Sequence, residues 1–373
     1  MKKLLTIAAL TASTFTAQAE VRINGFANLI GGITSSDDTV YGYEDRISFS
    51  EESSFAIQIT GDINEKMTAT GQILARGEDD YEAKVAWAYM TYEATDKLSI
   101  SAGRLRLPLF KYSASLDVGY SYHWVNAPRA VYDVTFNNID GVRLDYSTYA
   151  GDWEYNAQLA VGKITVDNES LKFVADNTAV VSVEAVNDWF KVRAVYGTAK
   201  VTLDSASVTQ AISVLNDLGL TELYNNLAFE NDTTPFLGLG LEVDKYDWFV
   251  SGEITMIETE KSFNPKSDAY YVTAGLRLGK FTPSVTYENF ESKEYKFLEQ
   301  VNALPLPDAN KAGIEGLVRG LQAGSFNKHN VITLGLRYDF DTNVAFKTDL
   351  SRYDNKLDDT ETTLLRVAVN YIF

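Results

Sequence analysis

One long stretch between two short strand-like segments gathers charged side chains that could act on an ion or a charged solute. The stretch runs from Gly103 to Tyr146, and within it Leu105–Asn138 shows no strand alternation. A connection this long is usually functional or disordered, and its many tyrosine and tryptophan residues argue against disorder. Opposite charges that face one another across water create a transverse field that distinguishes solutes by charge. The stretch offers two acids and three bases for such a field: Asp117, Asp133, Arg106, Lys111 and Arg129.

Arginines on neighbouring segments could supply the opposite side of the field. Arg76, Arg104 and Arg143 are assigned to the polar faces of three strand-like segments near the roots of the long stretch. Arg22 also lies on the polar face of its strand-like segment, but close to one end of that segment. Bidentate guanidinium groups favour solutes that carry carboxylate or phosphate. An ordinary solvated side chain is the alternative for each of these charges, and the sequence leaves both interpretations open.

The sequence contains no recognisable catalytic or metal-binding motif. It has two histidines, His123 and His329, and no cysteine, so a disulfide or a thiolate metal site is impossible and we predict no cofactor. A GxSxG elbow, an HExxH pair and a nucleotide-binding loop are all missing. His123 lies between Tyr122 and Trp124, which favours a packed residue over a general base. We therefore expect no enzymatic activity, although a Ser–His pair could still form in space.

Residues 1–19 have the features of a cleaved export signal. Two lysines precede a short apolar run over Leu4–Phe15, and Ala17-Gln18-Ala19 forms a cleavage site. The run is too short to span a bilayer as a helix, which needs about 20 residues. No other stretch approaches twenty apolar residues, so we expect no transmembrane helix. We expect the mature chain to be residues 20–373, a single domain.

The charge of the mature chain excludes a nucleic-acid-binding protein. Without Lys2 and Lys3, 31 basic side chains remain against 51 acidic ones, a formal net charge of −20. Contacts to phosphates require a basic face. The 22 Tyr, 19 Phe and 5 Trp, with only 7 Pro, are typical of a β protein with aromatic girdles.

The mature chain alternates strand-like runs with connections that are short and long in turn. The runs are about 9–13 residues long and show period-two hydrophobicity, most clearly in Trp153–Gly162. In the fourth run we place Val85, Trp87 and Tyr89 on the outward face. We predict sixteen runs in all, among them Val21–Ile33, Lys97–Arg104, Ile139–Tyr149, Ala179–Val186, Ala269–Leu278, Phe281–Asn289, Val344–Tyr353 and Thr362–Phe373.

Three of the connections are long. The first is the charged stretch described above. The second, Val201–Thr233, has helical spacing over Ser207–Leu227, which predicts a surface helix. The third, Glu291–Lys328, is expected to be helical around Tyr295–Leu304 and Gly313–Leu321.

Three features favour a membrane β-barrel over a soluble sheet protein. Most runs offer about 9–11 residues, enough to cross a bilayer when tilted. Aromatic residues such as Trp153 and Trp248 lie near run ends, where the lipid headgroups would be. The end of the chain, with Val369, Tyr371 and Phe373 on one face, resembles the C-terminal assembly signal of Gram-negative outer-membrane proteins. Because backbone groups in lipid need partners, the first strand must pair with the sixteenth. We predict an all-β fold: a 16-stranded antiparallel transmembrane barrel whose third loop folds inward.

With a long connection after the fifth strand, the chain resembles the general porins of the Gram-negative outer membrane. The resemblance rests on VRINGFANLIGG, GRLRLPLF, GYSYHW, GVRLDY and the terminal VAVNYIF. It implies a water-filled channel for passive diffusion of ions and small hydrophilic solutes, narrowed by the third loop. It also implies a homotrimer in contact with outer-membrane lipid and lipopolysaccharide. The chain departs from the family in its short second loop, Gly77–Tyr81, and in a third loop with more bases than acids.

Two other functions fit the same fold. A substrate-specific channel would have a saturable site in the lumen, built from Tyr112, Tyr120, Tyr122 and Trp124. A structural or adhesive barrel would contact a partner through its long loops and show no conductance. Acidic outer loops could collect cations or bridge lipopolysaccharide through divalent ions: Asp37-Asp38, Asp79-Asp80 and Asp358–Glu361. The charge counts do not predict which ion is preferred.

Overall fold

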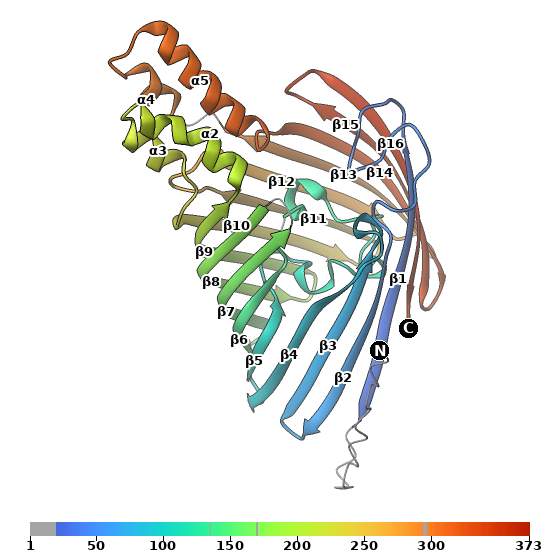
Figure 1. Ribbon diagram of the computed structural model, residues 1–373. Helices are drawn as coiled ribbons and strands as arrows, with labels where there is room; N and C mark the ends of the chain where they lie inside the picture. The colour runs from blue at the N-terminus through green and yellow to red at the C-terminus, as the bar shows by residue number, and fades with distance from the viewer. Residues whose placement is uncertain (1–19, 135, 169–170, 294–296) are drawn as a thin grey trace, which may run out of the picture.

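The chain forms a closed antiparallel barrel (Figure 1). The computed structural model describes residues 20–134, 136–168, 171–293 and 297–373, so the predicted signal at 1–19 lies outside the described residues. Each strand pairs with its neighbours in the sequence, which confirms the predicted fold class. The sixteen strands of the described part are β1 Val21–Thr34, β2 Ser54–Asn64, β3 Met67–Arg76, β4 Ala83–Thr95, β5 Leu98–Arg106, β6 Asn138–Ala150, β7 Trp153–Asn168, β8 Leu171–Asn187, β9 Phe190–Asp204, β10 Asp232–Lys245, β11 Trp248–Ile257, β12 Ser267–Leu276, β13 Phe281–Ser292, β14 Lys328–Asp341, β15 Val344–Asn355 and β16 Thr360–Ile372.

The barrel closes where the first strand meets the last. The register of β1 and β16 pairs Phe26 with Ile372 and continues to Thr34 and Leu364. Beyond it, the Gly25 amide donates to the Phe373 carbonyl at 2.9 Å, and the Phe373 amide donates to the Gly25 carbonyl at 3.0 Å. The predicted pairing of strand one with strand sixteen is confirmed, and the sheet has no free edge to expose to lipid.

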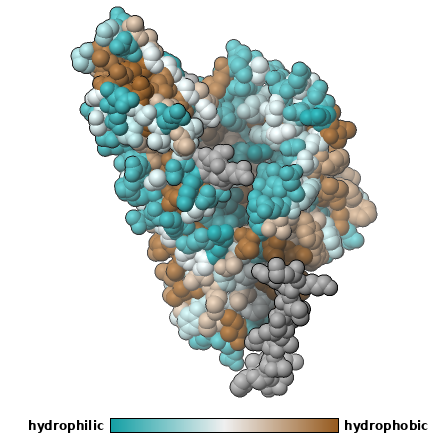
Figure 2. All heavy atoms as spheres, in the orientation of Figure 1, coloured by the Kyte–Doolittle hydropathy of each residue, from teal (hydrophilic) through white to brown (hydrophobic). Residues whose placement is uncertain are grey.

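The strands present apolar side chains outward and mostly polar ones inward. Leu239 and Leu334 are 60% and 58% exposed on the outer wall, whereas Ser251 and Thr273 are buried inside. Figure 2 shows hydrophobic residues over much of the wall and hydrophilic ones over much of the loop end, where a hydrophobic patch also lies among the helices. This alternation matches lipid on one face of the sheet and a lumen on the other.

A β-bulge overturns one predicted face. Ile73 pairs with Val85 and Gln72 with Trp87, so Ala86 is an extra residue in β4. One extra residue reverses the parity of every side chain that follows it. Trp87 is consequently buried inside the barrel, where its indole nitrogen donates to Gln58 at 3.1 Å. The outward assignment of Trp87 and Tyr89 was wrong, while Val85 does face outward and is 53% exposed.

The hairpin of β7 and β8 is longer than predicted. We expected a loop reaching about Thr178, but β7 continues to Asn168 and β8 begins at Leu171. Irregular pairing between Gly162 and Ile164, and again between Asp176 and Ala179, breaks the strict alternation there. The period-two signal therefore fades before the strands end.

Helices cap one side of the end that carries the long connections, here called the loop end; the opposite end is the turn end. The second long connection is helical as predicted, but it forms two helices, α2 (Ala206–Asp217) and α3 (Thr221–Leu227), where one was expected; the break lies at Gly219, whose φ is +73°. The third folds into α4 (Leu298–Asn302) and α5 (Asp308–Ala323); residues 295 and 296 of its predicted first helix lie outside the described residues. Figure 1 shows these helices together above β9–β13. No helix of the described residues is long and apolar enough to span a membrane.

The closing seam should be sensitive to a single methyl group. A Cβ at Gly25 would lie 2.5 Å from the Ala56 carbonyl oxygen and 2.3 Å from the Phe373 ring. We predict that Gly25→Ala lowers the stability of the folded barrel by about 1–3 kcal/mol, the usual cost of overpacking. Urea titration of the protein in detergent measures this. Gly61→Ala is the matched control, since a Cβ there meets nothing within 4 Å; equal destabilisation by both changes would contradict the prediction.

Candidate functional site in the barrel lumen

Loop 3, residues 107–137 between β5 and β6, lies inside the barrel and contacts its far wall. The Arg193 guanidinium on β9 donates to the carbonyls of Leu109 (2.9 Å) and Pro108 (2.6 Å). On β14, Arg337 donates to the carbonyls of Tyr120 (2.7 Å) and Tyr122 (2.8 Å). These bonds attach two separate parts of loop 3 to β9 and β14, which are not neighbours of β5 or β6 around the barrel. Loop 3 therefore crosses the lumen, as the sequence predicted.

Acidic wall residues hold the loop through its amides. Glu253 on β11 accepts from the Lys111 amide at 2.9 Å, and Glu288 on β13 accepts from the Ala130 amide at 3.0 Å. Asp349 on β15 accepts from the Val125 amide at 3.0 Å. A loop without regular structure leaves many backbone groups unpaired, and these contacts satisfy several of them.

The aromatic residues of loop 3 form a packed cluster against the wall. The Trp124 ring lies 5.6 Å from Tyr112 and 5.9 Å from Tyr122, and 5.6 Å from Tyr271 of β12. The Trp124 indole nitrogen also donates to Thr286 at 2.8 Å. These rings pack mainly against one another, although Tyr122 also lines one of the lumen cavities described below. Tyr120, the fourth member of the saturable site suggested from the sequence, donates to the Thr342 carbonyl at 2.6 Å.

Asp117 is the centre of the first charged cluster. One of its carboxylate oxygens accepts from Arg76 of β3 at 2.6 Å, and the other pairs with Arg106 at the root of the loop. Asn28 of β1 donates to the Asp117 carbonyl at 2.8 Å. Burial alone would raise the pKa of the carboxyl, but the two guanidinium groups outweigh it and hold the pKa below its ordinary value.

A second charged cluster was not predicted. Arg366 of β16 pairs with Glu52 at 3.0 Å and with Asp349 at 3.4 Å, and all three side chains are almost fully buried. Arg129 of α1 (Arg129–Tyr132) approaches Glu52 at 3.7 Å and lies over the ring of Tyr41. Arg366 and Arg129 together lower the pKa of the Glu52 carboxyl against the opposing effect of burial. The cluster joins loop 1 (residues 35–53, between β1 and β2), loop 3 and the last strand, β16.

The other predicted loop residues also lie in the lumen. Lys111 forms a buried ion pair with Glu242 of β10, and Asp133 pairs with Arg129 at 2.8 Å. Arg143 of β6 points inward, where it pairs with Asp145 at 2.8 Å. The structure therefore brings Asp117, Arg76 and Arg106 together. Arg143 lies beside them, since its guanidinium donates to the Arg106 carbonyl at 3.5 Å, whereas Lys111 pairs with Glu242.

Two predicted lumen arginines lie outside these charged clusters. Arg104 pairs across the sheet with Asp140 and shares its face with Ala88 and Ala102 on the outer wall, so its assignment to the lumen was wrong. An arginine can lie on that face because it is near the end of β5 and its charge is compensated at 2.8 Å. Arg22 has the predicted inward parity, since it lies opposite Thr60 in the register of β1 and β2, but it pairs with Asp62 at 2.8 Å near the turn end of β1.

Several charged wall residues that hold the loop were missed from the sequence. They are Arg193, Glu242, Glu253, Glu288, Arg337, Lys347, Asp349 and Arg366. Each stands at an inward position of a strand remote from loop 3 in the sequence. The usable signal was a charge at alternate positions within a strand, as at Lys347 and Asp349.

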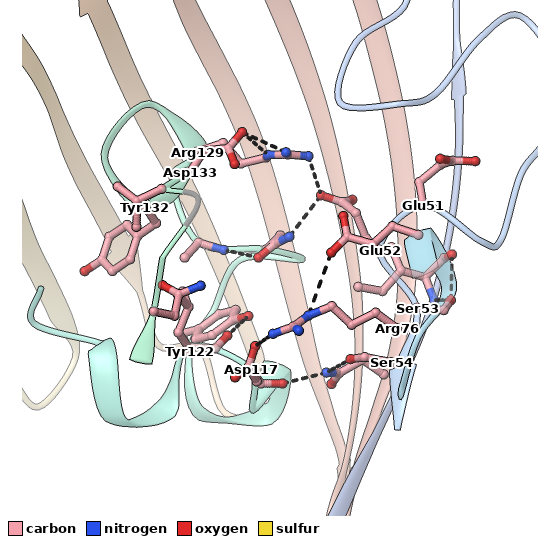
Figure 3. A pocket seen from close by; sticks show the side chains of 18 residues that line it. Glu51, Glu52, Ser53, Ser54, Arg76, Asp117, Tyr122, Arg129, Tyr132 and Asp133 are labelled. Atoms are coloured by element: carbon pink, nitrogen blue, oxygen red, sulfur yellow. Dashed lines mark hydrogen bonds and ion pairs between the residues drawn. The ribbon is translucent and has the colours of Figure 1, made fainter. Parts of the chain in front are cut away.

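Two polar cavities flank the Asp117 cluster. The first, of about 380 Å³, is lined by Asp117, Arg76, Arg129 and Glu52 and lies toward the loop end (Figure 3). The second, of about 280 Å³, lies toward the turn end and is lined by Arg106 together with inward residues of β6–β9. Within the described ranges, no group of three or more His, Asp and Glu side chains is arranged to hold a metal ion.

Comparison with known proteins identifies the family. A family model described as Gram-negative porin matches residues 5–373. The chain belongs to the Gram-negative porins. As a porin it lies in the outer membrane and forms a channel for the passive diffusion of solutes. The sequence search of curated proteins found no match.

Solved structures share the porin's barrel at low sequence identity. Salmonella typhi OmpF, solved with daunomycin, is 15% identical over 95% of this chain and 98% of its own, with a TM-score of 0.57. The anion-selective porin of Comamonas acidovorans is 13% identical over 95% and 100%, with a TM-score of 0.56. The trimer form of OmpT from Vibrio cholerae is 12% identical over 95% and 99%, with a TM-score of 0.54. At these identities the likeness concerns the fold.

The porin's loop 3 should loosen in acid. Because pairing depresses the pKa of Asp117, the stabilisation is present at neutral pH and is lost as the pH falls below the usual aspartate value, about 4. We predict larger and noisier single-channel currents below that pH in planar bilayers. Asp117→Asn should show the same currents at pH 7 and no further change of this kind in acid. Asp133→Asn is the control, since Asp133 is 56% exposed and pairs outside the cluster; an identical acid response in wild type and Asp117→Asn would count against Asp117.

Proposed function

We propose that ions and small hydrophilic solutes cross along a polar path between loop 3 and the wall formed by β1–β3 at the loop end and β6–β9 at the turn end. The supporting observation is the position of the two polar cavities. Asp117 lines the cavity at the loop end, and its partner Arg106 lines the cavity at the turn end. The Arg76–Asp117–Arg106 cluster is then the narrowest part of the path.

The charges along this path change sign. The cavity at the loop end is lined by more acids than bases: Glu51, Glu52, Glu78, Asp117 and Asp133 against Arg76 and Arg129. The cavity at the turn end is lined by more bases than acids: Arg106, Lys111, Arg143 and Arg193 against Asp145 and Glu184. Fields of opposite sign in series favour neither cations nor anions along the whole path. We therefore propose general diffusion with weak ion selectivity.

We also propose that the channel is passive and has no catalytic role. His123 packs against Trp124 at 4.0 Å and Phe249 at 4.6 Å, and its Nε2 shares a hydrogen bond with the Thr273 hydroxyl. Burial lowers the pKa of His123 well below its ordinary value. These features support a packed loop residue, as the sequence predicted.

Removing the central part of loop 3 tests the path. Deletion of residues 112–127 takes out Asp117 and Trp124, so we predict a clearly larger single-channel conductance in planar bilayers. The control is deletion of residues 308–322 in α5, which lies outside the barrel (Figure 1) and should leave conductance unchanged. Unchanged conductance after the loop 3 deletion would place the path elsewhere.

We propose that three copies assemble through the outer wall of β2–β5. A small-residue patch there consists of Gly61, Ala69, Gly71, Ala88 and Ala102, and it lines a shallow hollow of about 620 Å³. Small residues let two backbones approach closely inside a membrane. The trimer form of OmpT from Vibrio cholerae, which shares the fold, supports the same assembly here.

A bulky residue in the small-residue patch should break the trimer. We predict that Ala88→Trp yields monomers in detergent, because the indole fills the hollow that a neighbouring copy would occupy. Light scattering with detergent correction measures the mass. Ala194→Trp, on the outer wall of β9, is the control and should remain trimeric. A trimeric Ala88→Trp protein would move the interface to another face.

We propose lipopolysaccharide and outer-membrane lipid as the remaining partners. Arg104 with Asp140 and Lys163 with Asp176 form ion pairs on the outer wall near the loop end. Their position above the apolar wall matches the level of phosphate-bearing headgroups. The pairs would reorganise around such phosphates.

A further inference from the structure

A third cavity in the lumen is apolar. It has a volume of about 410 Å³ and lies at the loop end, between loop 3 and the inward faces of β7–β13. Loop 3 contributes Leu107, Leu109 and Val131 to its lining, and the wall contributes Val180, Val201 and Ala269, all buried. A water-filled lumen ordinarily carries polar side chains at inward positions. The apolar lining therefore needs its own explanation.

The change in polarity occurs along single strands. On β9 the inward positions nearer the turn end are Lys191 and Arg193, whereas Val195, Ala199 and Val201 follow toward the loop end. On β8 they change from Glu184 and Ser182 to Val180 and Ala175. Loop 3 lies between the two zones. The inward faces of β8 and β9 nearer the loop end are thus apolar and separate from the two polar cavities.

The lining favours aromatic molecules. Six phenylalanines from six separate segments line the cavity: Phe136, Phe173, Phe229, Phe236, Phe263 and Phe290. Phe136 stacks on Phe173 at 5.6 Å, and Phe229 meets Phe263 edge-on at 5.9 Å, so the rings form two rigid sides. Aromatic rings gain energy from stacked and edge-to-face contacts beyond the area that they bury.

The polar groups of the lining exclude strongly charged ligands. Asp133 is the one ionisable residue among the lining residues described, and its carboxylate already pairs with Arg129 at 2.8 Å. The Thr178 hydroxyl donates to the Ala175 carbonyl, and the Thr234 hydroxyl donates to Thr259. Among the described lining residues, no side chain carries a positive charge to receive an anion. A bound molecule must therefore be neutral over most of its surface.

Space remains because small residues lie between the phenylalanines. Ala175, Ala199, Ala269 and Gly197 contribute to the lining from three strands. Ligand sites of drug-sized molecules are typically about 300–1,000 Å³, and an apolar cavity of about 150 Å³ already accepts one benzene ring. We infer that this cavity is a binding site for neutral aromatic molecules of two or three fused rings, which enter from the loop end. The inference does not depend on conduction through the polar path.

Direct binding of 6-bromo-2-naphthol, which is neutral at pH 7, tests the inference. Equilibrium dialysis of the full mature protein in nonionic detergent should show saturable binding near one molecule per chain, above partition into micelles. Ala199→Phe fills the cavity and should abolish the saturable part, and Ala269→Phe should do the same from β12. The matched control is Ala194→Phe on the lipid-facing side of the same strand β9, which should bind as wild type does.

Crystals soaked with the same compound locate the site. The bromine should give an anomalous peak between Ala199 and Ala269 in the wild-type protein and none in Ala199→Phe. Binding that is non-saturable, or equal in wild type and both filled variants, would overturn the inference, as would a peak only on the outer wall. Each cavity variant is first checked for a folded barrel by its heat-dependent mobility on a gel. If Ala199→Phe or Ala269→Phe does not fold, the binding result of the other variant tests the inference.

Discussion

Lipid accepts no unpaired backbone group, and this constraint sets the rest of the structure. It forces β1 onto β16, where Gly25 and Phe373 exchange hydrogen bonds, and it turns the sheet into a cylinder. Sixteen strands make a cylinder too wide for wall side chains to fill. Loop 3 occupies part of that width, so the lumen acquires an interior of its own, with packed rings and buried charges. Because the closed barrel is so wide, a folded loop such as loop 3 is needed to narrow its lumen.

Loop 3 buries polar backbone groups inside the barrel, and side chains of the wall form hydrogen bonds with them. Arg193, Arg337 and Lys347 donate to loop carbonyls, while Glu253 and Asp349 accept from loop amides. Buried charges are costly unless paired, which explains why Asp117 stands between two arginines and why Arg366 stands between two carboxylates. Hydrophobic packing alone would hold the loop near the wall without fixing its height.

Sequence reasoning predicted the fold well because lipid enforces a strict period of two. The strand count and the closing pair followed from it, whereas the helices of the long connections were predicted from their own helical spacing. It failed at the bulge of Ala86, where one extra residue reverses the face of Trp87 without any local warning in composition. Arg104 shares its face with apolar Ala102, so parity read more strictly would have placed it outside. Which charges meet in the lumen depends on stagger around the barrel, and pattern along one strand carries no information about stagger. The sequence therefore did not show that Asp117 pairs with Arg76 and Arg106, or that Lys111 pairs with Glu242.

Three basic wall residues donate hydrogen bonds to main-chain carbonyls of loop 3, which every amino acid possesses: Arg193, Arg337 and Lys347. The side chains at those loop positions can therefore change over evolutionary time while the path of the loop through the lumen stays the same. A lineage could retune the inner surface of the channel, residue by residue, without first redesigning its scaffold.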